Sequence, residues 1–119
     1  MKRKILFLVV AVLAIFPIFR ASATPENKPD PNFFIYLCIG QSNMEAGAVP
    51  AEQDKDFNNP RFQFMAAVDM PKLGREMGKW YTAIPPICRE GNNLGPVDFF
   101  GRKMIDILPS EYHVGVINV

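Results

Sequence analysis

The sequence has few of the residues that metal sites need. Its 119 residues include one histidine and two cysteines. Neither a C-x-x-C pair nor a cluster of histidines occurs, so no spacing typical of metal ligands is present. We therefore expect no metal and no cofactor.

A hydrophobic run long enough to cross a membrane is also missing. The longest apolar stretch, Ile5–Phe19, has 15 residues and contains Pro17, whereas a spanning helix needs about 20. The basic residues Lys2–Lys4 before it and the small residues Ala21–Ala23 after it are typical of a secretory signal peptide. We expect residues 1–23 to be cleaved off, a secreted or periplasmic location and no stable membrane anchor.

The expected mature chain has no excess of positive charge. The signal peptide carries four of the 13 basic residues and none of the 12 acidic ones, which leaves 96 residues with 9 basic residues and a net charge of −3. A nucleic-acid-binding surface needs a basic face that neutralises phosphates. We therefore exclude nucleic acid as a partner.

Folding is expected to begin at Phe33. Residues 24–32 contain three prolines and no large apolar side chain, so they predict an extended tether. The run Phe33–Ile39 is apolar at every position, and a strand with two apolar faces belongs to a parallel sheet with helices packed above and below. We expect residues 33–119 to belong to one α/β domain.

A helix and a second strand are predicted near the end of the sequence. In Pro96–Leu108 apolar residues recur at helical spacing, and proline suits the first helical position. The run Val114–Val119 then predicts a second buried strand. Strand, connection, helix and strand form a βαβ unit, in which the two strands lie parallel.

The connection between these segments is less regular. Residues 45–93 contain five prolines and only short apolar patches, such as Phe62–Met65 and Trp80–Ile84. We expect short strands or turns inside it, and an irregular connection of this length often forms a functional surface. Trp80 and Tyr81 are interpreted as anchors of a loop to the core, with stacking on a sugar ring as the alternative.

The predicted elements are too few for a complete α/β domain. Two parallel strands and one helix cannot cover both faces of a sheet. A mature chain of 96 residues with a long irregular connection also buries little core. We therefore expect the chain to be the N-terminal part of a longer protein.

One hydroxyl lies where the first predicted strand ends. Gly40-Gln41-Ser42-Asn43-Met44 follows this strand directly, and a buried strand that ends in glycine can hold a following side chain rigidly at the edge of a sheet. Ser42 is the candidate nucleophile, and a plain turn serine is the structural alternative. Gln41 and Asn43 are expected to support the turn or to contact substrate.

These segments together resemble the SGNH hydrolases. The resemblance is carried by Gly40–Met44 after an apolar strand, by Leu94-Gly95-Pro96 with Phe99-Phe100-Gly101, and by Val114–Val119. Within that group the chain is most similar to the branch of sialate O-acetylesterases and acetylxylan esterases, whose nucleophile block is a Gly-Gln-Ser-Asn-Met of this kind. The resemblance implies a flavodoxin-like, three-layer α/β/α fold, of which only the N-terminal portion is present.

The resemblance also implies roles for individual residues. Ser42 would attack an ester carbonyl and form an acyl-serine intermediate that water then hydrolyses. The backbone N–H groups of Ser42 and Gly95 would form the oxyanion hole. The implied substrate is an acetylated carbohydrate, and the implied activity is that of a serine esterase that removes its O-acetyl groups.

The catalytic set is incomplete within this sequence. The family's third-block donor and its Asp-x-x-His, which supplies the general base, have no counterpart here. His113, the single histidine, falls outside the matching blocks and is interpreted as a surface or strand-edge residue. A serine hydroxyl without a base is a weak nucleophile, so we expect the chain as given to be inactive.

Two other functions fit the same sequence. One is a non-catalytic exported carbohydrate-binding or scaffold protein with an SGNH-like fold, and the other is a membrane-anchored interaction protein with an uncleaved N-terminus.

Cys38 and Cys88 would both enter an oxidising compartment, where a bridge between them is chemically feasible. For Cys38 the simpler interpretation is a small buried residue of the strand, without a structural bridge.

Overall fold

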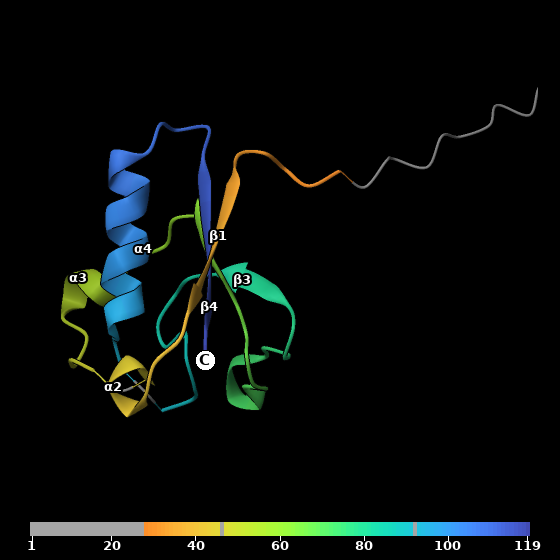
Figure 1. Cartoon of the computed structure of the whole chain (residues 1–119). Coiled ribbons are helices and arrows are strands. Elements are labelled where there is room, and N and C mark those ends of the chain that lie inside the picture. The colour runs from red at the N-terminus through yellow and green to blue at the C-terminus, as the bar shows by residue number, and fades with distance from the viewer. Residues whose placement is uncertain (1–27, 46, 92) are drawn as a thin grey trace, which may run out of the picture.

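The structure is a computed structural model that describes residues 28–45, 47–91 and 93–119, and these form a mixed α/β domain (Figure 1). The predicted signal peptide, residues 1–23, and the first part of the predicted tether lie outside the described residues. No helix in the described ranges is long and apolar enough to cross a membrane. In chain order the elements are β1 (Phe33–Cys38), α2 (Ser42–Glu45), α3 (Glu52–Lys55), β2 (Phe62–Met65), the 3-10 helix η1 (Pro71–Leu73), β3 (Trp80–Thr82), α4 (Pro96–Ile107) and β4 (His113–Asn118).

The four strands form one mixed sheet in the order β1-β4-β2-β3. β4 lies between β1 and β2 and is parallel to both, while β3 is antiparallel to β2. The register with β1 runs from Phe33 opposite His113 to Cys38 opposite Asn118. The predicted βαβ unit is therefore confirmed, and its two strands and its helix begin and end within one residue of the predicted positions.

Half of the sheet comes from the stretch that the sequence left unassigned. The apolar patch Phe62–Met65 forms β2, and the side chains of Phe62 and Phe64 are fully buried. In β3, Trp80 packs edge-on against Phe33, with ring centroids 5.1 Å apart, and Tyr81 packs against Phe64. Trp80 and Tyr81 are thus anchors, as interpreted, and this stretch supplies two strands and part of the core.

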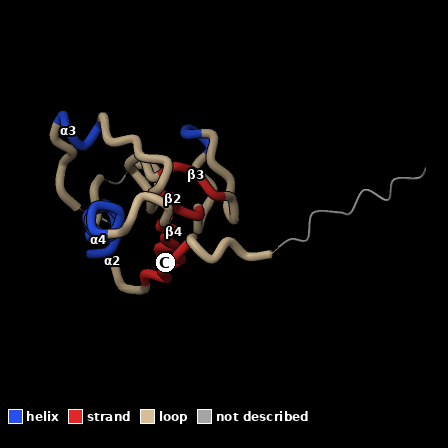
Figure 2. The backbone as a smooth tube through the Cα atoms, turned by 90° about the horizontal axis from the view of Figure 1, so that it is seen from above, coloured by secondary structure: helices blue, strands red, loops and turns tan. Residues whose placement is uncertain are grey.

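The hydrophobic core lies between the sheet and α4. Figure 2 views α4 end-on beside the strands, and α4 packs on β4 and β2. Val97 and Ile105 of α4 and Val114 and Val116 of β4 are buried in this core. Val97 and Ile105 are eight residues apart, a little over two helical turns, and Val114 and Val116 are two residues apart, so each pair lies on the same side of its element.

No described element covers the opposite face of β1. The side chains of Ile35 and Leu37 point to that face and are 54% and 60% exposed. The expectation that β1 is covered on both faces is therefore wrong for the described residues, because β1 is an edge strand and α2, α3 and α4 all lie to one side of the sheet (Figure 1). The described residues form one helical layer and one sheet layer.

Arg61 ties the end of α4 to the start of β4. Its guanidinium donates hydrogen bonds from Nε to the carbonyl of Tyr112 at 2.9 Å, from Nη1 to Ile105 at 3.0 Å, and from Nη2 to Leu108 at 3.1 Å and Pro109 at 2.8 Å. The last carbonyls of a helix have no intrahelical partner, and a cation there also complements the helix dipole. One side chain thus fixes the turn that leads the chain from the helix back into the sheet.

Replacing Arg61 with Met should lower the free energy of unfolding by about 2–4 kcal/mol, because four carbonyls lose a charged donor. The measurement is urea unfolding followed by circular dichroism. Lys103→Met, an exposed change on α4, is the control and should cost little. Equal stabilities of the two variants would contradict the role assigned to Arg61.

Gly101→Ala should destabilise the protein by about 1–3 kcal/mol, because a close-packed site tolerates no extra methyl group. A Cβ at this position would clash with the Phe62 ring. Helix propensity alone predicts the opposite sign, a gain of about 0.8–1.0 kcal/mol. The exposed Asp106→Ala on the same helix, measured by the same unfolding experiment, should follow propensity, and a stabilised Gly101→Ala would refute the close contact.

Candidate functional site

Ser42 lies at the edge of the sheet where the parallel strands end. Beyond β1 the chain stays paired with the end of β4, since the Val119 N–H donates to the Cys38 carbonyl at 3.0 Å and the Gly40 N–H donates to the Val119 carbonyl at 3.2 Å. Ser42 then begins α2, is exposed, and its hydroxyl bonds to no described residue. The carboxyl edge of parallel strands is where open α/β sheets bind ligands.

The turn around Ser42 is held by its backbone. The Gln41 carbonyl accepts a hydrogen bond of 2.7 Å from the Met44 N–H. The side chains of Gln41 and Asn43 are both exposed. The two predicted roles of these residues, turn support and contact with substrate, stay predictions.

The structure brings the Ser42 segment and Gly95 together. A Cβ on Gly95 would lie 2.8 Å from the Met44 carbonyl oxygen, so only glycine fits without a shift. The same oxygen accepts a hydrogen bond of 3.1 Å from Nδ2 of Asn118. The Leu94 N–H donates to the Ala48 carbonyl at 3.1 Å, which pairs the two segments further. Met44 thus joins three parts of the chain that are distant in sequence.

The Gly95 N–H, expected to help form an oxyanion hole, has an acceptor in this structure. It donates to Oδ2 of Asp98 at 2.9 Å at the start of α4. Asp98 is 2% exposed, and its Oδ1 has no partner among the described residues. The oxyanion role of Gly95 stays a prediction, and it would require the N–H to turn from Asp98 to the substrate.

His113 lies at the other end of the sheet from Ser42. It is the first residue of β4, opposite Phe33, whereas Ser42 follows the carboxyl end of β1. Five residues of strand separate the two ends, a rise of about 16 Å. His113 is therefore a strand-end residue, as interpreted, and cannot act directly as the base for Ser42.

An apolar cavity and a polar cavity flank α2. The apolar one, of about 230 Å³, is lined by Tyr36, Leu37, Cys38, Met44, Pro96, Val97 and Phe100. The second, of about 180 Å³, is called the polar cavity because Glu45, Arg89 and Asn118 line it, but most of its surface is apolar and comes from Ala67, Val68, Cys88 and Val119. Met44 and Glu45 are consecutive residues, so the segment that begins at Ser42 borders both.

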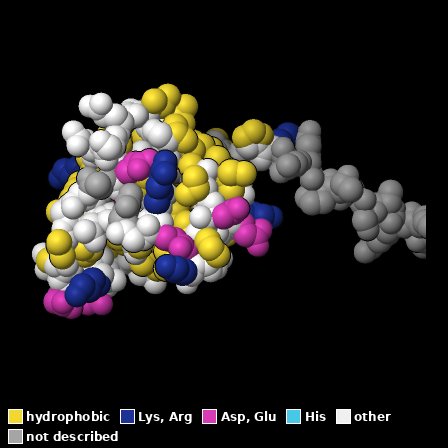
Figure 3. All heavy atoms as spheres, turned by 90° about the horizontal axis from the view of Figure 1, so that it is seen from below, with side chains coloured by type: hydrophobic (Ala, Val, Ile, Leu, Met, Phe, Trp, Pro, Cys, Tyr) yellow, Lys and Arg dark blue, Asp and Glu magenta, His cyan; other side chains and the backbone are white. Residues whose placement is uncertain are grey.

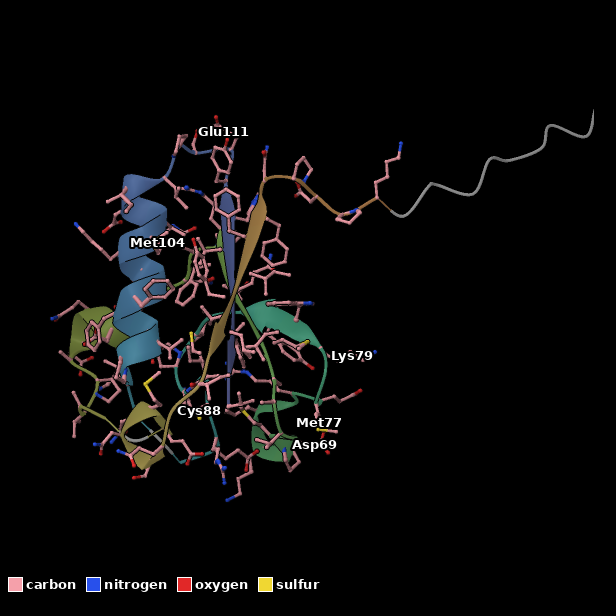
Figure 4. The ribbon with its side chains drawn as sticks, viewed as in Figure 1. Asp69, Met77, Lys79, Cys88, Met104 and Glu111 are labelled. Atoms are coloured by element: carbon pink, nitrogen blue, oxygen red, sulfur yellow. The ribbon has the colours of Figure 1, made fainter. Side chains whose placement is uncertain are left out.

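Both cysteines are free thiols. Cys88 is buried in the polar cavity, close to α2 and the end of β4 (Figure 4), and Cys38 is half-buried in β1. Burial raises the pKa of each thiol, and the nearby Glu45 carboxylate adds to the effect at Cys88. Two thiols held in the neutral form are poor nucleophiles. Within the described ranges, no group of three metal-ligating side chains could hold a metal ion.

The sequence-based reasoning missed Asn118, Arg89 and Asp98. Asn118 is 6% exposed in the middle strand, and its signal was present, since one amide interrupts an otherwise apolar run. Arg89 forms an ion pair of 2.7 Å with Glu45, and both residues line the polar cavity. That pairing has no sequence signal, because 44 positions separate the two residues.

No protein-family model matches the chain, and no solved structure matches it. The resemblance to SGNH hydrolases therefore rests on the residues quoted for it.

Arg102 lies near two aspartates whose pKa values move in opposite directions. Burial raises the pKa of Asp98, and a hydrogen bond from Arg102 lowers the pKa of Asp54. A raised carboxyl pKa favours folding at low pH, and this contribution is lost as the pH rises through the folded-state value. A lowered pKa favours folding above the unfolded-state value and is lost as the pH falls through the folded-state value.

Asp98→Asn and Asp54→Asn should therefore change stability with opposite signs at pH 7. Asp98→Asn keeps an acceptor for the Gly95 N–H and removes a buried charge, so it should gain stability relative to wild type, and the gain should shrink as the pH falls from the raised pKa of Asp98 to the usual aspartate value. Asp54→Asn should lose stability, and the loss should also shrink on acidification. Urea unfolding at pH 3, 5 and 7 measures both. The same sign for both variants would refute these electrostatic assignments.

Proposed function

We propose that this chain is the N-terminal part of a secreted or periplasmic serine esterase that removes O-acetyl groups from carbohydrate. The proposal follows the resemblance to the SGNH hydrolases of the sialate O-acetylesterase and acetylxylan esterase branch, with a three-layer α/β/α fold in the complete protein. The observation that carries it is the position of Ser42, exposed at the carboxyl edge of parallel strands and next to the Gly95 segment.

In the proposed reaction the Ser42 hydroxyl attacks the acetyl carbonyl. The alcohol of the sugar leaves with a proton, and water then hydrolyses the acetyl-serine ester to release acetate. The Ser42 N–H lies in the first turn of α2, where N–H groups have no intrahelical acceptor, and it can donate to the developing oxyanion together with the Gly95 N–H. The general base would come from residues after Val119.

The two cavities beside α2 support an ester as the substrate. An ester joins an apolar acyl group to an alcohol, which in a carbohydrate is rich in hydroxyl groups. Met44 borders the apolar cavity, and Glu45 borders the polar one. The α2 segment that Ser42 begins therefore borders two hollows, although Ser42 itself lines neither, and such hollows can hold the two parts of an ester.

A non-catalytic carbohydrate-binding protein with the same fold is the second candidate. The engagement of the Gly95 N–H by Asp98 favours it, because an oxyanion hole depends on donors that point at the place where charge develops. The sequence that follows Val119 separates the two candidates. An Asp-x-x-His in it supports the esterase, and its absence supports the binding protein.

In the complete gene product, Ser42→Ala should abolish acetate release from acetylated glycans, with a fall of about 10⁴-fold or more, because removal of a catalytic nucleophile leaves only the residual rate. His113→Ala is the control and should leave kcat nearly unchanged. The measurement is enzymatic detection of acetate from acetylated xylan and from O-acetylated sialic acid. Activity retained in Ser42→Ala, or a large fall in His113→Ala, would contradict the assignment.

A further inference from the structure

One buried amide joins the Ser42 segment to the middle of the sheet. Asn118 is the last residue of β4, is 6% exposed, and donates a hydrogen bond from Nδ2 to the Met44 carbonyl at 3.1 Å. Met44 lies in α2, two residues after Ser42. β4 is paired with a parallel strand on each side, so the amide belongs to a strand that is held along both of its edges.

α2 needs such a contact, because it is too short to be stable by itself. It has four residues, and the hydrogen bond of 2.7 Å from the Met44 N–H to the Gln41 carbonyl closes its turn. A single helical turn is marginal in water, since nucleation of a helix is unfavourable, and the last carbonyls of a helix lack an intrahelical partner. None of the four residues of α2, all of them described, is buried. The position of Ser42 therefore depends on contacts that other parts of the chain make with this turn.

The Met44 carbonyl oxygen also limits how the Gly95 segment packs. A Cβ built on Gly95 would lie 2.8 Å from this oxygen, which belongs to the backbone and cannot swing aside as the end of a flexible side chain can. In the proposed reaction the N–H groups of Ser42 and Gly95 donate to one oxyanion. The oxygen that accepts from Asn118 thus lies at the contact between the two segments that carry these donors, and a shift of it would change the spacing of the donors.

The surroundings of Asn118 determine how a variant at this position would behave. Three titratable or charged side chains line the cavity that Asn118 borders, and these are Cys88, Glu45 and Arg89. Burial and the Glu45 carboxylate raise the pKa of the Cys88 thiol, and a hydrogen bond with Asn118 acts in the opposite direction. Glu45 and Arg89 form an ion pair of 2.7 Å. At the end of the molecule where the parallel strands finish, acidic and basic side chains lie beside one another without a field of one sign (Figure 3). A carboxyl group introduced at position 118 would therefore titrate mainly under the influence of its burial, which raises the pKa of an acid.

We propose that Asn118 is a positioning residue that holds α2, and with it Ser42, at the end of the parallel strands. The inference rests on the proposed function for its catalytic meaning, and it adds a residue that touches neither the ester nor the attacking hydroxyl. The amide fixes Met44, and Met44 fixes the turn that begins at Ser42. A displacement of about 1 Å at a reacting group can cost about 10²-fold in rate, so the loss of this one hydrogen bond should be measurable in kcat.

The first test does not depend on catalysis. In the ¹⁵N-labelled 119-residue chain, Asn118→Leu removes the donor and keeps a side chain of similar size. The Met44 N–H should then exchange with solvent faster by about tenfold or more, because the turn that protects it opens locally. The Val114 N–H, which donates to the Arg61 carbonyl at 2.8 Å near the other end of β4, should change much less. Equal acceleration of both amides would indicate a general loss of stability, and no acceleration of Met44 would indicate no role in α2; either result would overturn the inference.

The second test measures acetate release by the complete gene product. Asn118→Asp replaces the amide with a carboxyl group, which can donate to the Met44 carbonyl when protonated and cannot when ionised. We expect kcat relative to the wild type to fall by about 10²-fold at pH 8 and by about tenfold or less at pH 5, with KM changed by less than about threefold. Asn58→Asp makes the same substitution at an exposed position and should match the wild type at both pH values.

Two kinetic results would overturn the positioning role of Asn118. A loss of kcat that is the same at both pH values would show that the donor to Met44 is not what matters. A rise in KM with kcat unchanged would show that Asn118 acts on substrate binding instead. If the wild type releases no acetate in a Ser42-dependent way, the proposed function fails, and the exchange comparison alone then decides whether Asn118 holds α2.

Discussion

The register of β4 between its two parallel neighbours is the constraint on which the rest of the structure depends. Cys38 lies opposite Asn118, and Val114 lies opposite Phe62. A slip of one residue would turn every β4 side chain to the other face of the sheet. Val114 and Val116 would leave the core, and the Asn118 amide would leave both the polar cavity and the Met44 carbonyl. Core and candidate site are therefore set by one alignment.

That alignment is held from both ends of the strand. Near its start, the Arg61 guanidinium donates hydrogen bonds to the Ile105 carbonyl in the last turn of α4 and to the Tyr112 carbonyl just before β4. The Val114 N–H donates to the Arg61 carbonyl at 2.8 Å. At its end, the ladder with β1 continues to Gly40 and leads directly into the Ser42 turn. The Ser42 turn and the Arg61 guanidinium thus lie at opposite ends of one strand ladder, which both adjoin.

Local patterns in the sequence predicted three of the elements, but they did not predict β2 or the strand order. β1 and β4 were predictable because each is a mostly apolar run of six residues or more, and α4 was predictable because its apolar residues recur at helical spacing after Pro96. β2 was not, because four residues, Phe62–Met65, are too short to separate a strand from any other apolar patch. The strand order and the exposed face of β1 depend on tertiary pairing, which no local pattern contains.

Some features of the candidate site could likewise be predicted from the sequence, and others could not. Ser42 was found because a motif follows a strand, and its approach to Gly95 was implied by resemblance alone. Asn118 was visible as a polar interruption of an apolar run, but its hydrogen bond to the Met44 carbonyl joins residues that are 74 positions apart. The Glu45–Arg89 pair joins residues that are 44 positions apart, and the hydrogen bond from the Gly95 N–H to Asp98 depends on the geometry at the start of α4. Neither contact could be predicted from the sequence.

Asp98 sets a condition on any catalytic reading of this site. Its carboxylate holds the Gly95 N–H in a buried position, and its second oxygen is unpaired there. Burial disfavours the charge on Asp98, so this hydrogen bond compensates part of the desolvation that the carboxylate suffers. A substrate oxyanion would have to compete with a carboxylate for the same donor. Such a competition succeeds only if the oxyanion brings more negative charge to the N–H than a partly compensated carboxylate does, which a tetrahedral intermediate offers and a ground-state ester does not. Where that condition is not met, the Gly95 N–H stays with Asp98, and the site then fits the non-catalytic candidate better than the esterase.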